Sequence, residues 1–391
     1  MTNFTYHIPT KIIFGKNEHK NIGKIISDYG FKKILFHYGS GSIKNNGCYD
    51  DIVNSLVENN INYVELAGVE PNPKISLVRT GVEICKKENI ELILAVGGGS
   101  VIDSAKAISF SALNENDPWD YFDGLAKPTK NIPVATILTI SASGSEMSSS
   151  CVITNEELGL KRGCGTELNR PLFSILNPEL TYSVNKYQTA CGIVDIMMHT
   201  LERYMTKIGS ASPTDDISVA IIKSTIKNGL VALENPSDYE ARAALMLNGT
   251  LSHNGLTGLG RDFFMISHQI EHELSGMYDH IAHGAGLAIV FPAWCKWAYK
   301  YDLSRFLLFA KDIMEVENKA TDEETILSAI DKLYKFFESI GMPTHLSEVG
   351  ITDDSKFEEM AVKCTRFGKR TLGGYINYGV KEIIEILNIA K

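Results

Sequence analysis

Histidines and carboxylates whose spacing suits a metal ion gather in the second half of the chain. Four of the ten histidines lie in residues 268–283, and these are His268, His272, His280 and His283. His268 and His272 are four residues apart, so on a helix their side chains share one face. Asp195 and His199 have the same spacing on a second predicted helix. We therefore predict that two helices converge on one divalent ion.

Imidazoles with one carboxylate suit Fe(II) or Zn(II), and a coordination position left open for substrate separates a catalytic ion from a structural one. Taken alone, Asp195 and His199 are more often surface groups or hydrogen-bonded core residues, but the downstream cluster favours metal binding. A metallopeptidase is the alternative from another enzyme class, because His268-x-x-Glu271-His272 inverts the zinc-peptidase pattern His-Glu-x-x-His. Such an enzyme has no use for dinucleotide-binding loops.

Two loops rich in glycine and serine have the composition of a dinucleotide site. The first follows a predicted strand and opens a helix, and its candidate contacts are Gly97, Gly98, Gly99, Ser100 and Asp103. Glycines let backbone amides and the helix N-terminus approach a pyrophosphate without Cβ clashes. The second loop, residues 139–146, offers hydroxyls and amides, with Thr139 and Ser143 as candidate contacts. The two loops together predict a bound dinucleotide.

A third loop bears on which coenzyme is used. Many NAD enzymes place an acidic residue on the ribose 2′-hydroxyl after an early strand. Here the corresponding loop has small and hydroxyl residues followed by a lysine, and its candidate contacts are Gly39, Ser40 and Ser42 beside Lys44. Hydroxyls and a cation suit a 2′-phosphate, so we expect NADP(H) to be preferred over NAD(H).

The elements that must position these loops are short apolar strands. Runs at residues 33–38, 90–96 and 132–137 each deliver a polar loop at the carboxyl end. Strands of this kind, separated by amphipathic stretches, are typical of a mainly parallel α/β sheet, which binds ligands at the carboxyl ends of its strands.

After about residue 185 the strand pattern fades and apolar residues recur at helical spacing. Asn185, followed by Gln188, predicts an N-cap and the start of a helix that carries Asp195 and His199. We place a domain boundary here, with a dinucleotide-binding α/β domain at residues 1–185 and a helical metal- and substrate-binding domain at residues 186–391. The crevice between two such domains is the expected active site.

Composition agrees with a globular enzyme of two domains. The chain has 391 residues, 44% of them hydrophobic, and a net charge of -9 without a long basic run, so neither nucleic acid nor an anionic membrane is an expected partner. Seven scattered cysteines include no Cys-x-x-Cys pair. No signal peptide or membrane-spanning apolar stretch is recognisable, and we expect a cytoplasmic protein.

With these residues assembled, the whole chain resembles the iron-dependent (group III) alcohol dehydrogenases, in the branch of NADPH-linked butanol dehydrogenases and aldehyde reductases. The resemblance rests on five motifs: Gly97-Gly-Gly-Ser-Val-Ile-Asp103, Ser143-Gly-Ser-Glu146, Asp195-x-x-x-His199, His268-x-x-x-His272-Glu-Leu and His283-Gly-Ala-Gly-Leu-Ala288. It implies a dehydroquinate synthase-like fold, in which a dinucleotide-binding domain precedes a helical domain, and a homodimer. It also implies four metal ligands: Asp195, His199, His268 and His283.

The resemblance further implies that the metal is Fe(II), although the ligand types admit Zn(II), and that His272 lies beside it. We expect reduction of a small to medium aldehyde, such as butyraldehyde, to a primary alcohol, with the ion as Lewis acid and His272 as proton relay. Glycerol dehydrogenase and lactaldehyde reductase, which share the fold, stay open as alternatives. Two features depart from the family pattern: His280, which we interpret as a solvent-facing loop residue, and the aromatic segment of residues 263–265.

Overall fold

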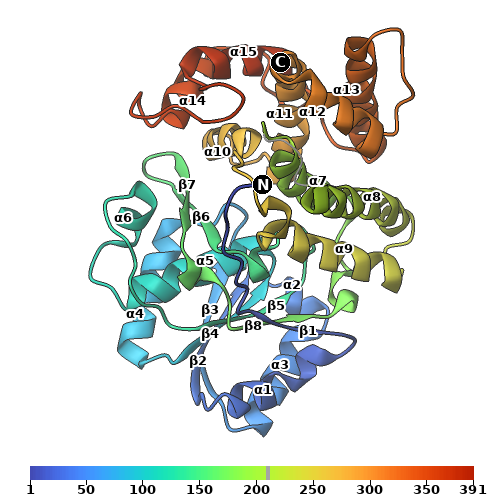
Figure 1. Cartoon of the computed structure of the whole chain (residues 1–391). Helices are drawn as coiled ribbons and strands as arrows, with labels where there is room; N and C mark the ends of the chain where they lie inside the picture. The colour runs from blue at the N-terminus through green and yellow to red at the C-terminus, as the bar shows by residue number, and fades with distance from the viewer. Residues whose placement is uncertain (208–211) are drawn as a thin grey trace. The chain divides into compact units, whose positions relative to one another are not determined.

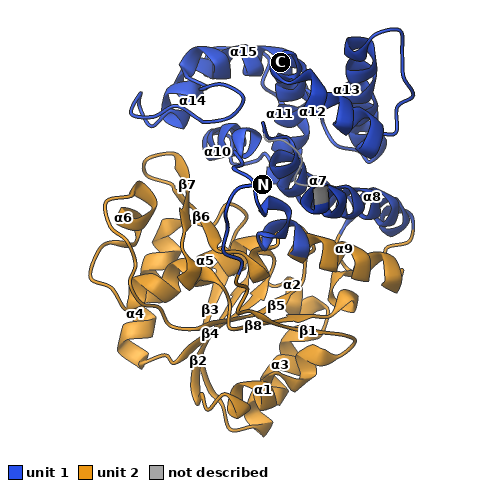
Figure 2. Cartoon of the chain, viewed as in Figure 1, with its two compact units in different colours: residues 1–6, 185–234, 251–391 blue, residues 7–184, 235–250 orange. Residues whose placement is uncertain are grey.

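The computed structural model describes residues 1–207 and 212–391. The chain forms two compact units (Figure 2): unit 1 comprises residues 1–6, 185–234 and 251–391, and unit 2 comprises residues 7–184 and 235–250. The domains predicted at residues 1–185 and 186–391 are defined by the ligand that each is expected to bind, whereas the two units are defined by compactness. Compactness does not test this, so the assignment stays a prediction.

Unit 2 is built on a six-stranded sheet in which every pair of neighbours is parallel (Figure 1). Its strands, in the spatial order β1-β8-β5-β4-β2-β3, are β1 (Lys11–Phe14), β8 (Phe173–Leu176), β5 (Val134–Leu138), β4 (Leu92–Gly97), β2 (Lys33–Gly39) and β3 (Asn62–Val69). A separate antiparallel hairpin consists of β6 (Ser150–Asn155) and β7 (Leu160–Gly165). The predicted parallel sheet is confirmed, and the three apolar runs are β2, β4 and β5.

Helices cover both faces of this sheet. Successive residues of a strand point to opposite faces, and accordingly Leu35 and Ile93 belong to one buried cluster while Ile34 and Phe36 belong to another. The first cluster includes residues of α4 (Ile75–Glu88), α5 (Gly99–Ala112) and α6 (Pro118–Asp123). The second includes residues of α1 (Ile22–Asp28), α2 (Ser42–Asn45) and α3 (Cys48–Glu58). Burial on both faces explains why the strands have continuous apolar runs.

The strand order brings the three predicted coenzyme loops to neighbouring positions. After β2 the chain adds β3 on one side and then returns to the other side of β2 as β4. Tyr38 of β2 pairs with Val96 of β4, and Gly97 of β4 pairs with Leu138 of β5. The carboxyl ends of all three strands therefore lie together, at the reversal of strand order where open α/β sheets bind ligands.

Unit 1 is helical in the part of it that the structure describes. Its helices are α7 (Lys186–Tyr204), α8 (Ser212–Glu234), α10 (Ile266–Met277), α11 (His283–Ala298), α12 (Leu303–Leu308), α13 (Asp322–Ser339), α14 (Phe357–Cys364) and α15 (Val380–Ala390). The remaining helix, α9 (Tyr239–His253), is divided, with residues 239–250 in unit 2. The predicted helical second half is confirmed, and Asn185 caps α7 by accepting a hydrogen bond from the Gln188 amide at 2.8 Å.

Helix α11 contacts α7, α10, α13 and α15, and its residues from Gly284 to Cys295 are all buried. Gly284 lets it approach α7 closely, since a Cβ there would lie 2.3 Å from the Cys191 carbonyl oxygen. The start of α11, and with it His283, is therefore held against α7. Among the helices of residues 1–207 and 212–391, none is long and apolar enough to cross a membrane.

Candidate active site

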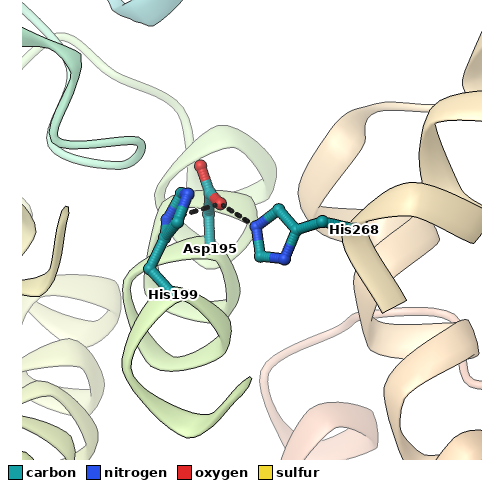
Figure 3. A group of neighbouring side chains, drawn as sticks. All are labelled: Asp195, His199 and His268. Carbon is teal, nitrogen blue, oxygen red and sulfur yellow. Dashed lines mark ion pairs between the residues drawn. The ribbon is translucent and has the colours of Figure 1, made fainter. Parts of the chain in front are cut away.

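Three side-chain atoms that could bind a metal ion converge from two helices of unit 1. Asp195 and His199 project from α7 and His268 from α10, and Figure 3 shows the three side chains turned toward one another. The Oδ1 atom of Asp195 lies 3.1 Å from Nδ1 of His199 and 3.7 Å from Nε2 of His268. All three atoms are buried, and none has a hydrogen-bond partner within the described part of the chain. Buried polar atoms rarely go unpartnered, so this arrangement points to an ion.

The separations between these atoms suit a divalent metal. Two ligands at about 2.1 Å from a tetrahedral ion lie about 3.4 Å apart, close to the 3.1 and 3.7 Å found here. His283, at the start of α11, places Nε2 3.8 Å from the same Asp195 oxygen. The three predicted histidine ligands are thus gathered around Asp195, the fourth, and the atoms of all four are of the types that Fe(II) and Zn(II) accept.

Electrostatics within the group favours a charged aspartate. Burial opposes the ionisation of Asp195, but the neighbouring imidazoles, His199 foremost, hold the pKa of its carboxyl well below the usual range. Burial lowers the pKa of His199 to about 4 against the pull of Asp195. The pKa of His268 is raised to about 9, because Glu202 and Asp195 overcome the effect of burial.

Two carboxylates contact the histidines predicted to be ligands. Glu202, on α7, hydrogen-bonds to Nδ1 of His268, and Glu271, on α10, hydrogen-bonds to Nδ1 of His283. We did not predict either contact from the sequence. A signal existed for Glu202, which follows Asp195 by seven residues and therefore lies on the same face of α7.

The other histidines of the region have different surroundings. His272 is half-buried, lies near Glu271 and has its ring centroid 5.6 Å from that of His283. His280 is exposed, as predicted, and its Nε2 is 3.2 Å from the Val349 carbonyl oxygen. His253, at the end of α9, lies against His199, with ring centroids 3.9 Å apart and ring planes tilted by 35°. The sequence prediction did not include His253, which precedes His268 by 15 residues and belongs to a different helix.

The predicted coenzyme residues lie in unit 2, on the loops after β2, β4 and β5. The β4 and β5 loops touch, since a Cβ on Gly99 would lie 2.3 Å from the Ser143 hydroxyl and Thr139 donates its amide to the Gly97 carbonyl at 3.1 Å. Gly98 is the N-cap residue of α5, which begins at Gly99 and includes Ser100. Their contact with a dinucleotide stays a prediction.

Asp103 lies one turn further along α5. Its carboxylate accepts hydrogen bonds from the Ser145 hydroxyl at 2.5 Å and from the Val152 amide at 2.9 Å. Both donors belong to the stretch that follows β5. Asp103 therefore ties that stretch to α5.

The lysine that follows β2 lies over two tyrosine rings. Gly39 ends the strand, and Ser40 and Ser42 are exposed. Lys44 lies over the ring of Tyr49, with its ammonium 4.6 Å from the ring centroid, and also faces the Tyr38 ring. Both tyrosines donate their hydroxyls to one carboxylate, that of Glu65 on β3, at 2.5 and 2.8 Å. The sequence did not reveal this acidic neighbour because it belongs to the next strand.

Known proteins resemble the chain from end to end. The family model described as iron-containing alcohol dehydrogenase matches residues 9–178, and the C-terminal model of the Fe-containing alcohol dehydrogenase family matches residues 189–390. NADH-dependent butanol dehydrogenase A of Clostridium acetobutylicum is 43% identical over 99% of both chains. NADPH-dependent aldehyde reductase YqhD of Escherichia coli is 35% identical over 95% of both.

The fold agrees with solved structures of such proteins. NADH-dependent butanol dehydrogenase A from Thermotoga maritima is 40% identical, with a TM-score of 0.96 over 100% of this chain and 99% of that one. The prediction of an alcohol and aldehyde oxidoreductase is confirmed, and the metallopeptidase alternative is wrong. The chain belongs to the iron-containing alcohol dehydrogenase family.

Proposed function

We propose that this enzyme reduces small to medium aldehydes, such as butyraldehyde, to primary alcohols, using NADP(H) and Fe(II). The observation that carries the proposal is the convergence of three buried, unpartnered ligand atoms from Asp195, His199 and His268. His283, 3.8 Å from Asp195 and 26% exposed, completes the ligand set on a side that a substrate can reach. When bound, the ion supplies a Lewis acid for the carbonyl oxygen, and the coenzyme supplies the hydride.

The chain's own residues hold the reactants and move the proton. The loops after β2, β4 and β5 bind the coenzyme, with the N-terminus of α5 toward its pyrophosphate. His272, beside His283 and half-buried, is placed to return a proton to the product oxygen.

A variant tests the role of His272. His272→Ala should lower kcat by roughly 100-fold and change its pH dependence, whereas His280→Ala, an exposed control, should leave both unchanged. If His272→Ala turns over at the wild-type rate across the pH range, His272 is not the relay.

The coenzyme preference rests on the loop after β2. Residues 39–44 contain no carboxylate, and their hydroxyls and Lys44 suit a 2′-phosphate. The relatives are divided, since the one at 43% identity is named NADH-dependent and the one at 35% NADPH-dependent. The nearby carboxylate of Glu65 is occupied by two tyrosine hydroxyls, which supports NADP(H). Faster turnover with NADH than with NADPH at equal concentration would refute the preference.

We also propose a preference for uncharged aliphatic substrates, which rests on the aromatic residues before α10. Phe263 and Phe264 are both exposed, and Phe263 lies against the Arg203 guanidinium at 4.9 Å. Butanol dehydrogenases are among the relatives. Higher kcat/KM with glycerol or lactaldehyde than with butanol or butyraldehyde would instead support the glycerol dehydrogenase or lactaldehyde reductase alternatives.

The decisive experiment is anaerobic oxidation of NADPH with butyraldehyde. Metal-stripped enzyme should be inactive, and Fe(II) should restore turnover, with Zn(II) as the comparison. Activity that does not depend on metal would overturn the proposal.

The seven cysteines are all free and buried, in agreement with a reducing cytoplasm. We also propose a homodimer, which sedimentation would test.

A further inference from the structure

We propose that Glu202 and Glu271 are positioning residues that set the orientation and metal affinity of His268 and His283. The inference rests on the metal centre proposed above and adds two residues that do not touch the ion. Each carboxylate hydrogen-bonds to the Nδ1 atom of one ligand histidine. Both glutamates are buried: Glu271 is fully buried, and only 3% of the Glu202 surface is exposed.

The position of each carboxylate determines which ring nitrogen is available. A carboxylate accepts hydrogen bonds, so a neutral imidazole facing it carries its proton on Nδ1. The lone pair is then on Nε2. In both histidines, Nε2 is the atom that faces Asp195, at 3.7 and 3.8 Å. Carboxylates in this position also make the imidazole a stronger ligand.

Glu202 additionally anchors the helix that carries His268. It accepts hydrogen bonds from the amides of Ser267 at 2.5 Å and His268 at 3.2 Å, in the first turn of α10. The N-cap residue of α10, Met265, has no side-chain cap, so a carboxylate from α7 takes over the capping role. The backbone and the ring of His268 are therefore held by the same side chain.

Glu271 occupies space that a glycine leaves open. A Cβ on Gly286, one turn into α11, would lie 2.7 Å from Cγ and 3.0 Å from Oε1 of Glu271. Because Glu271 is fully buried, its side chain has no room to withdraw. The second glycine of the His283-Gly-Ala-Gly286 motif thus admits the carboxylate that orients His283.

The test uses Co(II) as the probe, because its visible absorption reports coordination geometry. Glu202→Gln, Glu271→Gln and Gly286→Ala are compared with wild type in a chelator competition that measures the Co(II) dissociation constant. We expect each to bind roughly 10–100-fold more weakly and to shift the visible bands. Glu273→Gln, a buried glutamate two residues further along α10, is the matched control and should keep the wild-type affinity and spectrum.

Melting in the presence of chelator separates orientation from folding. Glu202→Gln should lower the metal-free melting temperature because it weakens the cap of α10, whereas Glu271→Gln should act mainly on metal binding. If Glu202→Gln fails to fold, Glu271→Gln and Gly286→Ala still decide the question. Wild-type affinity and spectrum in those two variants refute the inference, whereas failure of the wild-type protein to bind Co(II) refutes the proposed metal centre.

Discussion

Lys106 offers the sharpest test of how the loop after β5 is held. Its side chain on α5 is fully buried, and its ammonium donates hydrogen bonds to the carbonyl oxygens of Ser145, Ser148 and Ser150 at 2.6, 3.1 and 2.8 Å. It also reaches the hydroxyls of Ser145 and Ser148. Burial lowers the pKa of Lys106, and Asp103, whose own pKa is raised by burial, opposes that effect. One cation thus holds the stretch that follows the predicted coenzyme loop.

We predict that Lys106→Met destabilises unit 2 by about 3–5 kcal/mol. Methionine fills a similar volume, so the loss is electrostatic and comes from the hydrogen bonds. Each charge-assisted bond to a buried carbonyl is worth about 1.5–3 kcal/mol. The substitution also removes the positive charge that favours ionisation of the buried Asp103 carboxylate, and loss of a compensating buried charge costs up to about 3–5 kcal/mol. The predicted loss of about 3–5 kcal/mol is smaller than the sum of these contributions, because the freed carbonyl groups regain hydrogen bonds when the loop relaxes.

Urea denaturation with amide exchange would measure this effect. Amides of residues 145–150 should exchange faster in Lys106→Met, and the KM for the coenzyme should rise, while Co(II) affinity, a property of unit 1, should not change. Lys87→Met, which removes an exposed lysine from α4, is the control and should stay within about 0.5 kcal/mol of wild type. A free energy of unfolding for Lys106→Met within about 1 kcal/mol of wild type would contradict the reasoning.

Two further predictions concern pH and metal content. His37 is buried between the Leu66 carbonyl and the Ser104 hydroxyl, and burial lowers its pKa from 6.5 to about 4. The neutral ring therefore contributes its full stability above pH 6.5, and about 3 kcal/mol is lost as the pH falls from 6.5 to about 4. His37→Gln should flatten this part of the urea-denaturation profile, and an equal slope in both proteins would count against His37 as the cause. Asp195→Asn should weaken Co(II) binding by more than the roughly 100-fold expected when a residue that contacts a ligand, but not the ion, is replaced. Full metal content of this variant by mass spectrometry would argue against Asp195 as a ligand.

Local periodicity explains what could be predicted from the sequence. The four-residue spacing in Asp195/His199 and His268/His272 predicts that each pair shares a helix face, and α7 and α10 confirm both helices. Short apolar runs separated by amphipathic stretches predict strands of a mainly parallel sheet, and β2, β4 and β5 are such strands. These properties depend only on near neighbours along the chain, because 3.6 and 2 residues per repeat set the direction of side chains.

Contacts between distant segments could not be predicted in this way. Glu202 meets the amide of His268 across 66 positions of sequence. Its spacing places it on the face of α7 that carries Asp195, but no spacing rule says that it contacts His268. Glu65 lies beneath the loop after β2 because β3 adds to that edge of the sheet. The order of strands likewise comes from which apolar faces pack together and not from any single segment.

The sequence alone therefore determined the types of the candidate metal ligands, the helices that carry them and the glycine loops. The resemblance to a known family added a prediction of which histidines bind the ion. Only the tertiary structure decided which carboxylates hydrogen-bond to His268 and His283, and it showed that a Cβ on Gly286 would meet the Glu271 side chain. The physical reason is that ligand identity depends on residue type and local period, whereas the tautomer of an imidazole depends on the partner that packing brings to its other nitrogen.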